Sequence, residues 1–242
     1  MEKAYDALAA WFEYLNDDCD YPAWSQYFIE TLRRLNAGSK GLELGCGSGA
    51  FCRALARAGY QMSGADLSPC MLATAERLSR EEGLNIPYFQ TDAARLSAPD
   101  TYDFILSPND CFNYISPNRL KTAFERIRKS LVSGGYFLFD VSSEYKLLKK
   151  VADTVSVDDR EQVTYFSFNS LKGDRVEMDV TLFVKRSDGA FERYDERHIQ
   201  YIQTEDRVTS ALQAAGFSLL TVEGHLGENK DGSDRLNFIC RK

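Results

Sequence analysis

A glycine-rich turn is the first feature of the sequence that could do chemistry. The stretch 41–50, GLELGCGSGA, places Gly45, Gly47 and Gly49 between an apolar run and a helical pattern. Because glycine has no side chain, such a turn lets the backbone approach a ligand that lies across the helix N-terminus. The spacing fits a nucleotide cofactor, and Gly45-x-Gly47-x-x-Ala50 also satisfies the fingerprint of nicotinamide dinucleotide sites. A tight turn that serves packing alone is the alternative.

Asp66 follows this turn at a distance that suits a ribose. It lies 21 residues after Gly45, at the end of the next predicted strand, where a carboxylate can accept hydrogen bonds from both ribose hydroxyls. The spacing fits either cofactor. Asp66 could instead cap the next helix, although Ser68 fills that role better because it directly precedes Pro69.

Two further carboxylates separate the two cofactors. Glu43 stands two residues before Gly45, where it could hold the ammonium of a methionine group directly or through water but would repel a pyrophosphate. Asp92, in FQTDAARL, follows the third predicted strand and is placed to accept from an adenine amino group. These residues favour a cofactor that joins methionine to a nucleoside.

Strands and helices alternate around these residues. The apolar pattern predicts seven strands, at residues 40–44, 61–65, 86–90, 102–106, 136–141, 217–223 and 236–240. Helices are predicted at residues 5–14, 24–35, 49–58, 69–80, 118–131 and 205–215. Strands that alternate with helices of this length form parallel crossover units. We therefore expect a doubly wound α/β fold around a seven-stranded, mostly parallel sheet.

Residues 142–203 interrupt this alternation. A short helical stretch at 145–151 precedes three strand-like runs, which turn signals at 172–174 and 187–189 separate. The helix and two strands that follow resume the α/β pattern. The sequence therefore predicts a main domain and an antiparallel β insertion, with the boundaries 1–141 and 204–242 for the first and 142–203 for the second.

The motifs, in this order, resemble those of the class I S-adenosylmethionine-dependent methyltransferases. The first motif of that family is an acidic residue, any residue, then G-x-G-x-G, as in residues 43–49, and later motifs match at Asp66, Asp92 and the Gly-Gly turn before Tyr136. The resemblance covers the α/β segments, roughly 36–141 and 204–242.

This resemblance implies a fold, a cofactor and a reaction. The expected reaction is transfer of a methyl group from S-adenosyl-L-methionine to an N or O atom of a small-molecule acceptor by in-line displacement. Two alternatives stay open. The acceptor could be RNA, or the chain could be a non-catalytic module that binds the cofactor, because binding motifs establish a ligand and not turnover.

The resemblance also implies a set of cofactor-binding residues. The glycines would lie against the cofactor, Asp66 would bind the ribose, Leu67 and Met71 would flank the adenine, and Asp92 with Ala93 would contact the adenine edge. For Met71, a plain place in the helix core is an equal alternative. The complete expected set is Tyr5, Glu43, Gly45, Cys46, Gly47, Gly49, Asp66, Leu67, Met71, Asp92, Ala93 and Ser107.

A narrower resemblance concerns the stretch 107–114, SPNDCFNY, after the fourth strand. It is similar to the D-x-x-N-Y-[LI] stretch of a bacterial subgroup that carries a β insertion after strand five. The layout of that subgroup is similar to that of N-methyltransferases acting on amino sugars. In it an N-terminal tyrosine closes over the cofactor, and Tyr5 occupies the matching place. Tyr5 could equally hold its helix to the core.

An acceptor that is an ammonium or a hydroxyl must lose a proton, so methyl transfer to it needs a general base. Asp110 and His198 are the candidates, with Tyr114 as an orienting group. Each has a simpler alternative. Asp110 could cap the turn through its side chain, and His198, on a period-two strand, could be a solvated or structural histidine.

The insertion is expected to form a lid or one wall of the acceptor pocket, because it emerges after a strand whose carboxyl end borders the site. It could instead mediate dimerisation through a strand edge, so the chain is expected to be a monomer or a homodimer. The residues 142–203 carry no cluster of Lys and Arg, which argues against RNA as the partner.

Composition agrees with these expectations. The formal charge of −7 and the pI near 5.0 argue against a broad nucleic-acid surface. Six scattered cysteines and only two histidines predict neither a metal site nor a disulfide framework. The N-terminus does not read as a secretory signal, and no window approaches the ~20 apolar residues of a membrane span. We expect a cytoplasmic location.

Overall fold

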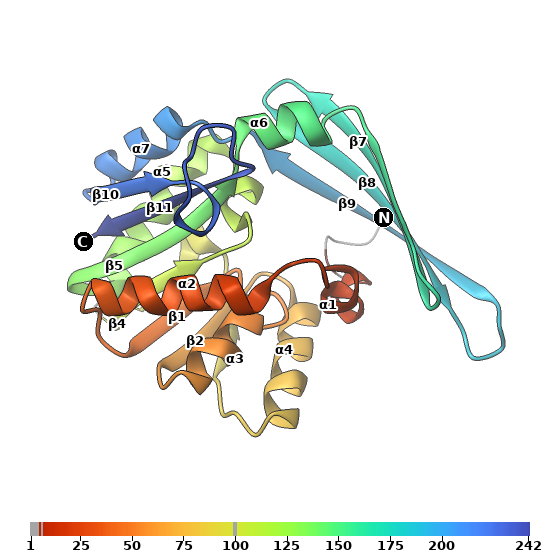
Figure 1. Ribbon diagram of the computed structural model, residues 1–242, viewed down its shortest axis with the longest axis horizontal. Helices are drawn as coiled ribbons and strands as arrows, with labels where there is room; N and C mark the ends of the chain where they lie inside the picture. Colours follow the sequence, from red (N-terminus) through yellow and green to blue (C-terminus); the bar gives the residue numbers. More distant parts are fainter. Residues whose placement is uncertain (1–4, 6, 99–100) are drawn as a thin grey trace.

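The computed structural model describes residues 5, 7–98 and 101–242 of the chain. It contains a seven-stranded sheet in the order β10-β11-β5-β4-β1-β2-β3 and a separate four-stranded sheet in the order β6-β7-β8-β9. The four-stranded sheet stands beside the α/β part, and the short helix α1 lies between them (Figure 1). The prediction of an α/β fold with an antiparallel β insertion is confirmed.

The large sheet is mostly parallel. Its strands are β1 (Lys40–Leu44), β2 (Gln61–Asp66), β3 (Tyr88–Gln90), β4 (Tyr102–Ser107), β5 (Leu131–Ser142), β10 (Ser218–Glu223) and β11 (Arg235–Arg241). Strand β11 pairs antiparallel with both β5 and β10, whereas the other pairs are parallel. The order of the strands reverses between β1 and β4. In open α/β sheets ligands bind at the carboxyl ends of the strands beside such a point.

Helices cover both faces of this sheet. They are α2 (Tyr21–Arg34), α3 (Ala50–Arg57), α4 (Pro69–Glu81), α5 (Pro117–Ser130) and α7 (Glu205–Ala214), with short 3-10 turns η2 (Ala93–Arg95), η3 (Cys111–Tyr114) and η5 (His225–Gly227). Buried side chains of α2 and α3 form one apolar cluster with the sheet, and those of α5 and α7 form another. The sheet is thus packed between two apolar clusters.

The N-terminal region differs from the expected pair of helices. Instead of one helix over 5–14, a 3-10 turn η1 (Leu8–Ala10) leads into the four-residue α1 (Phe12–Leu15), and residue 6 lies outside the described part of the chain. Helix α2 begins three residues before the predicted Trp24, because Asp20 caps it by accepting from the Ala23 N–H at 2.9 Å.

The four-stranded sheet contains one strand more than predicted. Its strands are β6 (Val155–Asp159), β7 (Val163–Lys172), β8 (Arg175–Lys185) and β9 (Phe191–Tyr201), preceded by α6 (Glu144–Lys146) and the π-helical turn η4 (Leu147–Val151). Strand β6 was not predicted, because it is short, ends in two acidic residues and has no buried apolar face. The inner face of the sheet packs Val163, Val180 and Leu182 against Leu8.

No helix among the described residues has the length and apolarity to cross a bilayer. Over the same residues, no cluster of three or more His, Cys, Asp or Glu side chains could hold a metal ion. All six cysteines are free thiols.

Candidate active site

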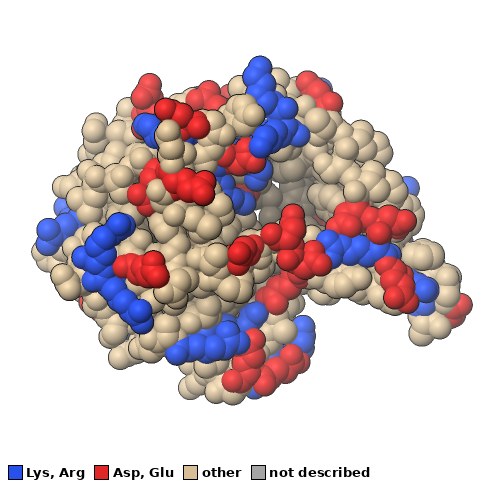
Figure 2. All heavy atoms as spheres, in the orientation of Figure 1, with Lys and Arg blue, Asp and Glu red and all other residues tan. Residues whose placement is uncertain are grey.

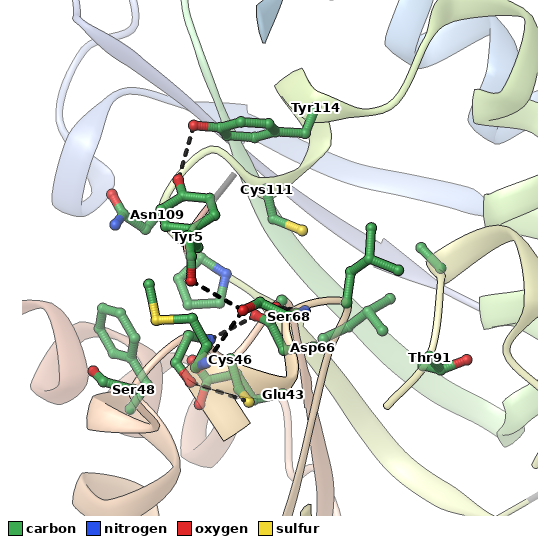
Figure 3. Close-up of a pocket in the computed structure, with 18 of the residues that line it drawn as sticks. Tyr5, Glu43, Cys46, Ser48, Asp66, Ser68, Thr91, Asn109, Cys111 and Tyr114 are labelled. Carbon is green, nitrogen blue, oxygen red and sulfur yellow. Dashed lines mark hydrogen bonds between the residues drawn. The ribbon is translucent and has the colours of Figure 1, made fainter. Parts of the chain in front are cut away.

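A cavity of about 890 Å³ opens at the carboxyl ends of β1, β2, β3 and β4, near the upper end of the ~300–1,000 Å³ range of ligand sites. The predicted cofactor residues that line it are Tyr5, Glu43, Gly45, Cys46, Gly47, Asp66, Leu67, Met71, Asp92 and Ala93. Figure 3 shows that several of these side chains converge on one space. Residues that are remote in the chain therefore share one wall.

The glycine loop presents its backbone to this cavity. Gly47 has a φ of +51°, and a Cβ there would meet only Phe12, at 3.9 Å. A Cβ at Gly45 would instead lie 2.3 Å from the Cys111 sulfur, so this glycine is needed for close packing of the loop after β4. In this turn, Gly45 allows close packing against Cys111, and Gly47 leaves its backbone open to the cavity.

Asp66 ties the loop to the end of β2. Its Oδ2 accepts from the Gly47 N–H at 2.8 Å, and its Oδ1 accepts from the Ser68 N–H at 2.9 Å. Burial raises the pKa of this carboxyl, against the opposing effect of the backbone N–H groups of Ser68, Gly47 and Leu67. A carboxylate can accept up to about four hydrogen bonds, so Asp66 retains capacity for ribose hydroxyls.

Glu43 lies beneath the loop and is 1% exposed. Its Oε2 accepts from the Cys52 N–H in the first turn of α3 at 2.7 Å. Burial raises the pKa of Glu43 to about 8. A cation delivered to this part of the cavity would find a carboxyl that it can ionise.

The opposite end of the cavity offers an apolar surface with a charged edge. Leu67 is 66% exposed although it lies on the wall, and Met71 is buried in α4. Asp92 accepts from the Ala94 N–H at 2.9 Å and pairs with Arg119 at 2.5 Å. An exposed leucine beside a carboxylate fits a flat aromatic ligand with amino groups at its edge.

Two residues of the expected set lie behind the wall. Gly49 is the N-terminal cap of α3, and a Cβ there would be 2.5 Å from the Tyr88 hydroxyl oxygen. Ser107 is fully buried and donates to the Leu44 carbonyl at 2.7 Å, which joins β4 to β1. Both residues shape the site from outside the lining.

A pair of tyrosines closes one end of the cavity. The hydroxyls of Tyr5 and Tyr114 are 2.8 Å apart and both side chains lie on the wall (Figure 3). Burial raises the pKa of each phenol well above its usual value, so both stay neutral near pH 7. The Tyr114 hydroxyl also lies 3.3 Å from His198 Nδ1.

Asp110 does not line the cavity, unlike the expectation for a base. Its carboxylate pairs with Arg235 at 2.8 Å and accepts from Gln200 at 2.6 Å. Burial would raise its pKa, but Arg235 and Lys146 lower the pKa below the usual range. Asp110 is thus held as an ionised group within a buried ion pair and is a poor proton acceptor.

His198 is buried on β9, at 4% exposure, so it is not a solvated histidine. Its Nε2 lies 3.0 Å from an oxygen of Glu196, which precedes it by two residues on the same face of the strand. Our sequence reasoning missed Glu196. The alternation E-x-H in ERHIQ was the signal, and it is weak because it gives no sign of which face is buried.

Other wall residues were not assigned to the cofactor from the sequence. Most of them lie within or beside the stretches 41–50, 66–69, 89–96 and 107–114, namely Leu44, Ser48, Ala50, Phe51, Ser68, Pro69, Gln90, Thr91, Pro108, Asn109, Cys111 and Ile115. Phe12, Tyr21 and Arg119 reach the cavity only through the fold.

Comparison with known proteins assigns the site to a family. Residues 42–135 match the family described as "Methyltransferase domain". The chain is 29% identical to "Putative methyltransferase GWCH70_2453" of Geobacillus sp. (strain WCH70), over 98% of this chain and 99% of that protein. It superposes with a TM-score of 0.88 on an S-adenosylmethionine-dependent methyltransferase from Clostridium acetobutylicum ATCC 824, at 27% identity and with 99% of each chain covered. This chain is a class I S-adenosylmethionine-dependent methyltransferase.

The fold of the methyltransferase is also that of the sugar N-methyltransferase KedS8 from Streptoalloteichus sp. ATCC 53650. The TM-score is 0.79 at 18% identity, with 100% of this chain and 94% of that chain covered. The cofactor of this methyltransferase is S-adenosyl-L-methionine. The wall residues suit it, because the open backbone at Gly47, the buried carboxyl of Glu43 and the exposed Leu67 match a cofactor with an ammonium group and an adenine.

Binding of S-adenosylmethionine at pH 7 is expected to release a proton from Glu43. In the free protein the pKa of Glu43 is about 8, so the carboxyl is mostly protonated. A nearby ammonium lowers the pKa of a carboxyl and favours its ionised form. Calorimetric titrations in several buffers measure this release, because the observed binding enthalpy then changes linearly with the ionisation enthalpy of the buffer. The slope of that line gives the number of protons released. In Glu43→Gln the slope should vanish, and a wild-type slope of zero would contradict the role of Glu43.

Proposed function

We propose that this methyltransferase transfers the methyl group to an N or O atom of a small-molecule acceptor. The acceptor enters at the end of the cavity that Tyr5, Tyr114 and Asn109 line. The observation that carries the proposal is the contact of the Tyr5 and Tyr114 hydroxyls, at 2.8 Å, with a path from Tyr114 to His198. This path leads a proton away from the cavity into a buried imidazole.

The chain's own residues supply binding and proton transfer. Asp66 and the backbone of Gly47 hold the cofactor, and Glu43 faces its ammonium. When bound, S-adenosylmethionine supplies a methyl group that is activated by a positively charged sulfur, so no protein nucleophile is needed. The acceptor atom that gains the methyl group must lose a proton if it arrives as an ammonium or a hydroxyl. Tyr5 and Tyr114 pass that proton to His198 as neutral hydroxyls.

The direction of this proton path follows from the ends of the hydrogen-bond chain. An ionised Glu196 only accepts, so His198 donates from Nε2 and leaves Nδ1 free to accept from the Tyr114 hydroxyl. The Tyr114 oxygen can then accept from Tyr5, whose own oxygen accepts from the bound molecule. Every donor points away from the cavity, as a general base at its far end requires.

The charge of the wall supports a small molecule over RNA. Arg119 is the one basic side chain among the described wall residues, and Asp92 pairs with it. On the face shown in Figure 2, Lys and Arg are interspersed with Asp and Glu rather than gathered into a basic patch. A protein that binds RNA needs clustered cations to neutralise phosphates. The likeness to a sugar N-methyltransferase is one of fold and is compatible with an amine acceptor.

The β insertion, in this proposal, backs the acceptor end of the cavity from behind Tyr5 and Tyr114, since no residue of 142–203 is among the described residues that line the cavity. Strand β9 carries His198 and Glu196, and the inner face of the sheet packs on the N-terminal segment that brings Tyr5 to the cavity. We assign residues 142–203 to this supporting layer behind the acceptor end and residues 1–141 and 204–242 to the cofactor domain.

The acceptor class can be tested with methyl-labelled S-adenosylmethionine. We expect label to appear in the small-molecule filtrate of a cell extract and not in purified RNA from the same cells. Chromatography before and after mild acid and base treatment separates N-methyl products from labile ester products. Boiled protein is the control. Label in RNA alone would contradict the small-molecule proposal.

A further inference from the structure

Glu196 gathers four N–H groups from two parts of the chain. It is 1% exposed on β9. One oxygen accepts from the backbone N–H of Ala7 at 2.7 Å and of Leu8 at 2.9 Å. The other accepts from the Tyr5 backbone N–H at 2.7 Å and faces His198 Nε2 at 3.0 Å. One carboxylate therefore holds both the N-terminal segment and the imidazole.

The N-terminal segment held in this way reaches across the mouth of the cavity, from the acceptor end towards the ribose site. The Tyr5 side chain lies on the wall, and its carbonyl accepts from the Ser68 hydroxyl at 3.2 Å. The Ser68 N–H in turn donates to Asp66. The segment thus spans the cavity from Glu196 on β9 to the end of β2, next to the carboxylate assigned to the ribose.

We propose that Glu196 is a positioning residue that latches the N-terminal segment over the bound cofactor and, in the same contact, holds His198 in the Nε2–H tautomer that accepts a proton from Tyr114. The inference rests on the proposed function and deepens it. It links closure of the cavity to the tautomer of His198, because both depend on the two carboxylate oxygens of Glu196. An open segment would remove the Tyr5 hydroxyl, the first member of the proton path, together with three of the four donors.

The structure makes Glu196→Gln a sharp test. Each oxygen of Glu196 accepts from two N–H groups, so either orientation of the glutamine amide places its NH₂ group against two donors. His198 is the only one of the four partners that can change from donor to acceptor, by moving its proton to Nδ1. We therefore expect the variant to contain His198 as the Nδ1–H tautomer and to lose the Tyr5 N–H contact.

Two measurements report on these consequences without an acceptor. Long-range ¹⁵N–¹H spectra of histidine-labelled protein give the tautomer directly, and the chain has only two histidines, His198 and His225. Displacement of labelled S-adenosylhomocysteine gives its rate of release, which should rise about tenfold in Glu196→Gln, as expected for the loss of one charge-assisted hydrogen bond. Glu192→Gln, an exposed glutamate on the same strand, is the matched control and should leave both values unchanged.

Ala7→Pro keeps the result decisive if Glu196→Gln fails to fold. Proline removes the Ala7 N–H while Glu196 stays intact, and the φ of Ala7, −83°, is close to the value that proline imposes. Release of S-adenosylhomocysteine should again be faster. An unchanged release rate in Ala7→Pro, or an unchanged tautomer in a folded Glu196→Gln, would overturn the inference. Failure of the wild-type protein to bind S-adenosylhomocysteine would instead refute the proposed function.

Discussion

Replacing Asp66 with alanine is expected to weaken the binding of S-adenosylmethionine by about 100-fold, since the loss of two hydrogen bonds to a charged group costs about 3 kcal/mol. The variant lacks the carboxylate that would bind the ribose hydroxyls. It also lacks the acceptor of the 2.8 Å hydrogen bond from the Gly47 N–H, so the glycine loop should loosen. Isothermal titration calorimetry measures the dissociation constant.

Asp66→Asn is the graded comparison for this experiment. The amide keeps one oxygen that can accept from Gly47, so its loss of affinity should be smaller than that of Asp66→Ala. Thermal unfolding of both variants shows whether the fold persists. If Asp66 were only a helix cap, both variants would bind the cofactor as the wild type does, and that outcome would contradict the ribose assignment.

Replacing His198 with glutamine is expected to lower kcat for methyl transfer by about 10²–10³-fold, within the range of general-base catalysis. Glutamine can bond Tyr114 but cannot take its proton. The affinity for S-adenosylmethionine should stay within about twofold of the wild type, because His198 does not line the cavity. Formation of S-adenosylhomocysteine with the labelled small-molecule fraction measures kcat.

His225→Gln is the matched control, because it removes the only other histidine and leaves β9 untouched. Its kcat should equal that of the wild type. Asp110→Asn separates the two bases proposed from the sequence. The ion pair with Arg235 predicts that this variant loses stability through a disrupted buried pair. If Asp110→Asn lowered kcat as much as His198→Gln does and left stability unchanged, Asp110 rather than His198 would be the base.

The cofactor half of the site could be predicted from spacing along the chain. The glycine loop, Glu43 and Asp66 lie within one strand–turn–helix–strand unit, so their spacing along the chain already determines their relation in space. The strand β1 (Lys40–Leu44) has the predicted bounds for the same reason. Asp92 required one further step, the expectation that β3 joins the same sheet edge, and the sheet order places it there.

The contacts in the acceptor half of the site could not be predicted from spacing along the chain. Tyr5, Tyr114 and the pair Glu196–His198 come from three segments, and the contacts between them span up to 191 positions of the chain. The expected α-helix does not form at Tyr5, Ala7 and Leu8, whose N–H groups donate to Glu196 on a strand that no local pattern connects to them. Tertiary contacts outweighed the helical periodicity at this point.

The amino-acid sequence by itself determined the donor side of this methyltransferase: the α/β alternation, the turn at Gly45–Gly49 and the carboxylates that suit a methionine-bearing nucleoside. Only the tertiary structure decided the surroundings of the two candidate bases, neither of which lines the cavity. It pairs Asp110 with Arg235 and buries His198 behind Tyr114. The physical reason is that proton acceptance depends on burial and on the partners of a group, and those are set by contacts between distant segments rather than by residue type or spacing.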